Sequence, residues 1–205
     1  MNEQTYNKIL ELASLCLDYG LVQRKTMHQD GVTYESDTTH TVMLGIIGTA
    51  VAAKLYPHLD LGKISQFIMV HDLVEVYAGD TPTLKITHDT FFQEKEERER
   101  QALQRIKSEF HETFPWICDT IEEYERLQSP EACFVKAFDK ILPKLTVVLN
   151  DGASLRKVYS EMTREEATKT FDNQRIRIAS LVEHVPEILT MWEYFVDKEL
   201  KAFRK

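Results

Sequence analysis

The sequence predicts an all-α protein built as a single domain, and three observations lead to that prediction. The 205 residues include only 7 glycines and 6 prolines, and runs of β-branched residues are rare. Long stretches repeat apolar side chains with the 3.6-residue period of an α-helix. A chain of this length can bury a full hydrophobic core as one domain, and it contains no internal repeat or linker.

Apolar periodicity and capping residues place the elements in order. The first helix is expected over residues 3–19, where Gly20 suits a left-handed cap. Residues 21–36 have no helical period, and the Asp30-Gly31 pair between short β-formers favours a small hairpin. Later helices are expected over 38–55 with Ser36 or Asp37 as N-cap, 61–78, 88–112, 115–127, 131–148 with a bend at Pro143, 163–183 and 186–203.

The composition is that of a soluble globular protein and excludes several partner classes. The net charge of −8 gives no indication of a nucleic-acid polymer or an anionic membrane as partner. The N-terminus lacks the regions of a signal peptide and no apolar run reaches about 18 residues, so a cytoplasmic protein is expected. Cys16, Cys118 and Cys133 show no ligand spacing and are expected to be reduced thiols in the core.

The segment 68–83, with the sequence IMVHDLVEVYAGDTPT, is the chemical centre of the chain. In a helix, His71 and Asp72 each lie about one turn from Glu75, so the three side chains share a face. Leaving them unpaired in an apolar helix would cost roughly several kcal/mol. A bound metal ion is a partner that suits all three, and a buried polar network without a ligand is the alternative.

Two further side chains join this group if the helices converge. His40 lies in the first turn of its helix, where a lone histidine is more often structural. Asp139 lies among apolar residues of its helix, or it pairs with a neighbouring lysine at the surface. Together with His71 and Asp72 they would offer two imidazoles and two carboxylates. Such a set suits one Mn²⁺, Co²⁺, Fe²⁺ or Zn²⁺ ion rather than Ca²⁺.

A metal ion in such a site makes the chain a candidate hydrolase. The ion polarises a phosphoryl oxygen and lowers the pKa of its water. Glu75 is placed to take a proton from that water. Asp80, beyond the Gly79 turn, can orient the water or protonate the leaving oxygen.

Three blocks of the sequence resemble the HD-domain metal-dependent phosphohydrolases, in particular their 5′-deoxynucleotidase branch. The blocks are ESDTTH at 35–40, HDLVEVYAGDTPT at 71–83 and KAFDK at 136–140. The resemblance covers about residues 20–150 and implies an HD-domain helical bundle. We therefore expect residues 1–205 to form a single HD domain, with a metal-site core over about 20–150 and C-terminal packing helices over about 163–203.

The resemblance also implies a reaction, the hydrolysis of (deoxy)nucleoside 5′-monophosphates to nucleoside and phosphate. It implies metal ligands at His40, His71, Asp72 and Asp139, and catalytic roles for Glu75 and Asp80. The expected substrate contacts are Arg24, which would orient the phosphate, with Lys25, Asp72, Asp80, Thr81, Thr83 and Asp139. The partner is then a small-molecule nucleotide, and related proteins commonly form homodimers. Residues 25–34 depart from the nucleotidase pattern, which leaves the sugar preference open.

Three other functions stay open at this stage. The same fold can act on another phosphate ester, such as a (p)ppGpp-like nucleotide. A di-iron oxygenase of the HD type needs more ligands between Asp72 and Asp139, where His88 and His111 are present without ligand spacing. A regulatory HD-like domain would have lost its metal, whereas this sequence keeps every ligand type.

Overall fold

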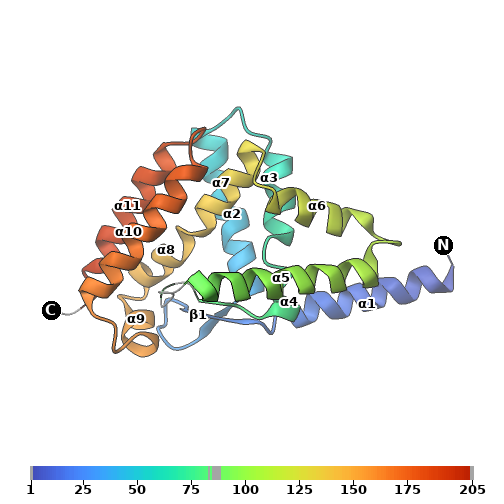
Figure 1. Ribbon diagram of the computed structural model, residues 1–205, viewed down its shortest axis with the longest axis horizontal. Coiled ribbons are helices and arrows are strands. Elements are labelled where there is room, and N and C mark those ends of the chain that lie inside the picture. The colour runs from blue at the N-terminus through green and yellow to red at the C-terminus, as the bar shows by residue number, and fades with distance from the viewer. Residues whose placement is uncertain (1, 83, 85–88, 204–205) are drawn as a thin grey trace.

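The computed structural model describes residues 2–82, 84 and 89–203, and helices dominate this part of the chain (Figure 1). The helices are α1 (Glu3–Tyr19), α2 (Asp37–Leu55), α3 (Leu61–Val70), α4 (Glu75–Ala78), α5 (Asp89–Phe110), α6 (Pro115–Glu125), α7 (Pro130–Asp139), α8 (Leu142–Leu149), α9 (Ala153–Val158), α10 (Arg164–Leu181) and α11 (Glu187–Leu200). The strands β1 (Gln23–Met27) and β2 (Tyr34–Ser36) pair antiparallel. The all-α prediction is confirmed.

The strands form the hairpin that the Asp30-Gly31 pair indicated. The Asp30 carboxylate accepts hydrogen bonds from the backbone N–H groups of Val32 and Thr33, at 2.8 and 2.9 Å. Gly31 has a φ of 63°, in the left-handed region that glycine adopts without strain. The hairpin carries Arg24 on β1 to the beginning of α2.

The expected continuous helix over 61–78 is interrupted, so that prediction is wrong. α3 ends at Val70, and α4 begins only at Glu75. The intervening turn is tight, because the Leu73 N–H donates to the Val70 carbonyl and the Glu75 N–H to the Asp72 carbonyl, three residues back. This turn presents His71 and Asp72 together, whereas adjacent residues of a regular helix point about 100° apart.

The expected helix over 131–148 is also two helices. The N–H groups of Lys140 and Ile141 bond to carbonyls three residues back, and α8 starts at Leu142. Pro143 lies in the first turn of α8, where its missing N–H leaves no hydrogen bond unmade. The predicted bend is therefore confirmed, and Asp139 lies at the end of α7, just before it.

Three smaller expectations need correction. α9 was not predicted, because six residues after the left-handed Gly152 are too few to show a period. Gly20 has a φ of −67°, so α1 does not end in the expected left-handed cap. Cys16 is exposed and Cys133 is half-buried, which leaves Cys118 as the one core thiol among the three free cysteines.

Two clusters of buried apolar side chains flank the middle of the molecule. One cluster is built by α2, α3, α7, α8, α10 and α11 and includes Leu44, Phe67, Ile68, Phe134, Phe138, Phe171 and Trp192. The other joins α1, α5 and α6 and includes Leu15, Val70, Leu73, Ile106 and Ile121. In Figure 1, α10 and α11 form one end of the molecule and α1 with α6 the other. Because α3 supplies residues to both clusters, its C-terminal end, with His71, lies where they meet.

Within the described residues, α2 is the one helix long and apolar enough to cross a membrane by length and composition. Its first turn nevertheless buries the polar side chains of Asp37 and His40. The helix also packs on α3 and α7, with Val42 and Ile46 exposed on its other side. Its apolar residues therefore belong in part to the core of the domain.

Candidate metal centre and active site

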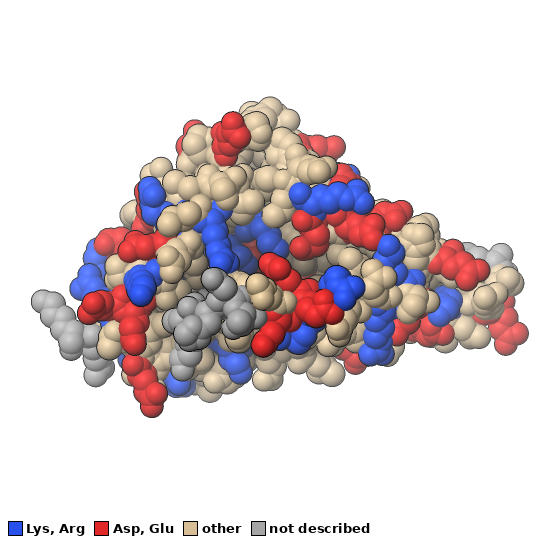
Figure 2. Space-filling view, viewed as in Figure 1, with Lys and Arg blue, Asp and Glu red and all other residues tan. Residues whose placement is uncertain are grey.

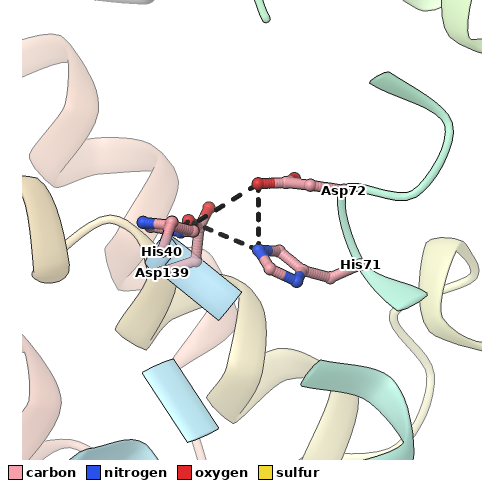
Figure 3. A group of neighbouring side chains, drawn as sticks. All are labelled: His40, His71, Asp72 and Asp139. Carbon is pink, nitrogen blue, oxygen red and sulfur yellow. Dashed lines mark hydrogen bonds and ion pairs between the residues drawn. The ribbon is translucent and has the colours of Figure 1, made fainter. Parts of the chain in front are cut away.

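Four side chains from three elements of the chain meet at one point (Figure 3). His40 comes from the first turn of α2, His71 and Asp72 from the turn between α3 and α4, and Asp139 from the end of α7. Each side chain offers one ligand atom, and these four atoms all lie within 4.8 Å of one another. The structure therefore brings together all four residues that the sequence singled out as metal ligands.

The separations of these atoms suit a common ion. Nε2 of His40 lies 2.9 Å from Oδ1 of Asp139, and Nε2 of His71 lies 3.0 Å from Oδ2 of Asp72. The two cross pairs, His40 with Asp72 and His71 with Asp139, are each 4.0 Å apart. Ligands about 2.1 Å from an ion lie about 3.0 Å apart when adjacent and about 4.2 Å when opposite in an octahedron.

The hydrogen bonding of His71 favours a cation between the ligand atoms. Its Nδ1 lies 2.8 Å from the carbonyl oxygen of Ile68, so Nδ1 carries a proton and donates it. In the neutral ring, Nε2 then directs a lone pair at the Asp72 carboxylate, and it has no hydrogen-bond partner among the described residues. Two lone pairs facing each other favour a cation between them, so the donor set fits a divalent transition-metal ion.

Arg24 lies beside this cluster and is held by acidic side chains. Its Nη1 donates to Asp37 at 3.1 Å and to Asp72 at 2.9 Å. Burial disfavours the charge, but the nearby carboxylates of Asp72, Asp139 and Asp80 more than offset it and raise the pKa of Arg24. A permanently charged guanidinium therefore lies next to the predicted metal ligands.

Glu75 and Asp80 supply two further carboxyl groups. Glu75 is buried at the start of α4, and its Oε2 has no hydrogen-bond partner in the described part of the chain. Burial and the charges of Asp72 and Asp80 raise the pKa of Glu75 well above its usual value. Burial also raises the pKa of Asp80, although Arg24 opposes that shift. Carboxyl groups with raised pKa values at a cleft are candidates for proton transfer near neutral pH.

These side chains line a pocket with a volume of about 340 Å³, which is in the range of small-molecule sites. Figure 2 shows the hollow in the middle of one face, with basic side chains on its wall and charges of both signs around it. His71, Glu75 and the predicted substrate contacts Arg24, Lys25, Asp72, Asp80, Thr81 and Asp139 line it. Thr83 lies outside the described residues.

Sequence analysis missed several cations of this pocket, namely Lys95, Arg100, Lys136, Lys140 and Lys144. Lys140 is the nearest to the cluster, with Nζ 2.7 Å from Oδ2 of Asp139. We expected Asp139 either to pair with a lysine or to join the site, and Asp139 does both. The KAFDK block already contained Lys136 and Lys140, but no local pattern distinguished Lys95 and Arg100 from an ordinary solvated helix face.

The comparison with known families adds an independent observation. A model of the HD domain matches residues 21–182. The chain belongs to the HD domain family. The family match includes α10, so it extends beyond the 20–150 region in which the sequence blocks were found.

Two individual proteins resemble this chain. The 5′-deoxynucleotidase HDDC2 of Dictyostelium discoideum is 32% identical over 139 residues, covering 64% of this chain and 71% of the relative. The crystal structure of a predicted metal-dependent phosphohydrolase from Magnetospirillum magnetotacticum MS-1 superposes with a TM-score of 0.75. It covers 98% of this chain and 97% of that chain at 21% identity, which shows the common fold. The predicted class, a hydrolytic enzyme of the metal-dependent HD phosphohydrolases, is confirmed.

Proposed function

We propose that this HD-domain chain hydrolyses (deoxy)nucleoside 5′-monophosphates to nucleoside and phosphate, using one metal ion held by His40, His71, Asp72 and Asp139. The observation that carries the proposal is the convergence of these side chains beside a pocket of nucleotide size with basic walls. The relative from Dictyostelium, which is named a 5′-deoxynucleotidase, supports a nucleotide as the phosphate ester.

The cluster consists of two imidazoles and two carboxylates, a donor set that suits Mn²⁺, Co²⁺, Fe²⁺ or Zn²⁺. No cysteine of the described chain joins it. When bound, such an ion supplies Lewis acidity at a phosphoryl oxygen and at the attacking water. For a di-iron site, His111 is unsuited: it is exposed, lies 3.3 Å from Asp119, and is not one of the four clustered ligand residues. His88 lies outside those residues.

Glu75 is proposed as the base and Asp80 as the acid of the reaction. The buried Oε2 of Glu75 is free to accept the proton of the water that attacks phosphorus. As the bond from phosphorus to the 5′-oxygen breaks, Asp80 donates a proton to that oxygen. Burial raises the pKa of both carboxyl groups, so the two roles require Asp80 to hold its proton and Glu75 to be ionised by the bound metal and water.

Arg24 is proposed to orient the phosphate, and its replacement gives the first prediction. We expect Arg24→Ala to lower kcat/KM by about 10- to 100-fold, because a charge-assisted hydrogen bond contributes about 1.5–3 kcal/mol. Metal content is measured alongside, since Arg24 also bonds to Asp72. Arg126→Ala, at an exposed arginine of the α6 end, is the matched control. An unchanged kcat/KM would remove Arg24 from the site.

The second prediction concerns the substrate. Protein stripped with EDTA is supplied with Mn²⁺, Co²⁺, Zn²⁺ or Mg²⁺, and phosphate release is measured from ribo- and deoxynucleoside 5′-monophosphates. We expect a transition metal to restore release, and the ratio of deoxy to ribo rates gives the sugar preference. If metal binds and no nucleotide is hydrolysed, another phosphate ester, such as a (p)ppGpp-like nucleotide, replaces the proposed substrate. Absence of metal binding would overturn the proposed site.

The organisation of the whole molecule is also part of the proposal. We take residues 1–205 as one HD domain that works as a cytoplasmic homodimer without nucleic-acid or membrane partners. Exposed apolar side chains on α1 and α2 are available for contact with a second copy, and they include Leu10, Leu17, Val42 and Ile46. Sedimentation of the purified protein tests the dimer against the monomer mass of 23.9 kDa.

A further inference from the structure

The pocket continues beyond the metal cluster to a second polar group that the proposed chemistry does not use. Lys144 of α8, Gln174 of α10 and Glu199 of α11 line its wall. Nζ of Lys144 lies 3.3 Å from Oε2 of Glu199 and 3.4 Å from Oε1 of Gln174. The side chains of Lys144 and Glu199 are only 6% and 3% exposed. A lysine and a glutamate are thus buried together against a cavity.

This buried pair is poorly satisfied as a structural contact. Oε2 of Glu199 has no hydrogen bond within the described residues, although the ammonium is close. Lys144 has three donors but only these two long contacts to oxygen, whereas a good N–H···O bond is about 2.9 Å long. Burial lowers the pKa of Lys144 and raises that of Glu199, so neither charge is fully compensated by the other. A buried ion pair of this quality contributes little to stability.

Other residues fix the position of the lysine. Its ammonium lies 4.1 Å from the centre of the Phe171 ring and 6.0 Å from that of Trp192. These cation–π contacts hold the ammonium in place. Its N–H groups are then directed at the oxygens of Glu199 and Gln174. The structure therefore maintains a preformed set of one donor group, one carboxylate and one amide.

One pocket contains both the metal cluster and the second polar group. Lys140 contacts Asp139 at the metal cluster, and Lys144, in the first turn of α8, lines the same pocket. Apolar or aromatic side chains also line this pocket, namely Pro143, Val147, Leu155 and Tyr159. A ligand with its phosphate at the cluster therefore shares one cavity with these side chains and with Lys144, Gln174 and Glu199.

We propose that Lys144, Gln174 and Glu199 bind the polar edge of the nucleobase. This inference rests on the proposed nucleotidase function. Every base edge places a hydrogen-bond acceptor next to a donor. The ammonium of Lys144 donates to the acceptor, the Glu199 carboxylate accepts from the donor, and the Gln174 amide can do either. The apolar walls contact the faces of the base.

The test uses a variant that removes both charges at once. Lys144→Met/Glu199→Leu keeps similar volumes and leaves neither charge buried alone, which is the costly outcome of a single change. The measured quantity is the ratio of kcat/KM for the preferred nucleotide to kcat/KM for deoxyribose 5-phosphate, which has no base. We expect this ratio to fall at least about tenfold, as two charge-assisted hydrogen bonds are lost.

The control changes two residues of α11, the half-buried Glu193 that pairs with Arg175 and the exposed Lys198, as Glu193→Gln/Lys198→Met, and should keep the wild-type ratio. Thermal unfolding shows whether each variant is folded. If the double variant does not fold, Gln174→Leu replaces it, with a severalfold fall of the same ratio expected. A folded variant with an unchanged ratio would overturn the proposal and show that the Lys144–Glu199 pair only connects α8 to α11. If the wild type hydrolyses deoxyribose 5-phosphate but no nucleotide, the substrate proposal and this inference both fail, while the phosphohydrolase class stands.

Discussion

His71→Ala should abolish metal binding and phosphate release together. Nε2 of His71 is one of the four converging ligand atoms, and the Nδ1 contact with the Ile68 carbonyl directs it into the cluster. Loss of a residue that only supports a ligand costs about 10- to 100-fold in metal affinity or activity, so loss of a ligand should exceed about 100-fold. Metal content after dialysis and hydrolysis of a nucleoside monophosphate are the two measurements.

A matched histidine provides the control for this experiment. His111 is exposed at the end of α5 and contacts Asp119, so His111→Ala should keep wild-type metal content and rate. Asp72→Asn tests a second ligand with almost no change of shape and should also lose metal. Normal metal content and hydrolysis in a folded His71→Ala protein would exclude His71 from the centre.

The helices and the His71-Asp72 doublet could be predicted because both are encoded locally, whereas His40 and Asp139 were assigned as ligands only through the family resemblance. Apolar periodicity is a property of each segment, and the His71-Asp72 doublet stands out as two charged groups in an apolar run. The interruption at 71–74 could not be predicted in the same way, because the apolar pattern continues through it, and the one at 140–141 was indicated only by Pro143. At each one, hydrogen bonds to the carbonyl three residues back replace helical ones while the apolar side chains stay buried. Apolar periodicity indicates which side chains are buried, but it does not reveal a change from hydrogen bonds four residues back to bonds three residues back.

The walls of the pocket were beyond prediction for a different reason. Lys144 and Glu199 are 55 positions apart, and each lies in a segment that resembles an ordinary amphipathic helix. Lys95 and Arg100 lie in the most highly charged helix, where most such residues face solvent. Only the packing of α5, α8 and α11 around one cavity brings these four residues together. The lining of the cavity is therefore the part of this site that depends most on tertiary structure.

Glu75→Gln should separate metal binding from turnover. Glu75 is outside the four-residue cluster, so the variant should bind metal as the wild type does. Its amide cannot accept the proton of the attacking water, and loss of a general base lowers kcat by about 10²- to 10⁴-fold. Glu109→Gln is a suitable control, because Glu109 bonds to Tyr77 of the same short helix at 2.6 Å without reaching the cluster. Full activity in Glu75→Gln would identify another base, with Asp80 as the next candidate.

The pH dependence gives a second measurement of the same role. Burial and the neighbouring carboxylates of Asp72 and Asp80 raise the pKa of Glu75, so its proton-accepting form increases as the pH rises above the ordinary glutamate range of about 4–5. Activity of the wild type should therefore rise with pH along that limb, and the residual activity of Glu75→Gln should lose this dependence. Metal content is measured at each pH, since metal binding by His and Asp ligands is itself pH-dependent. A limb that persists in Glu75→Gln at constant metal content would assign it to another group and remove Glu75 as the base.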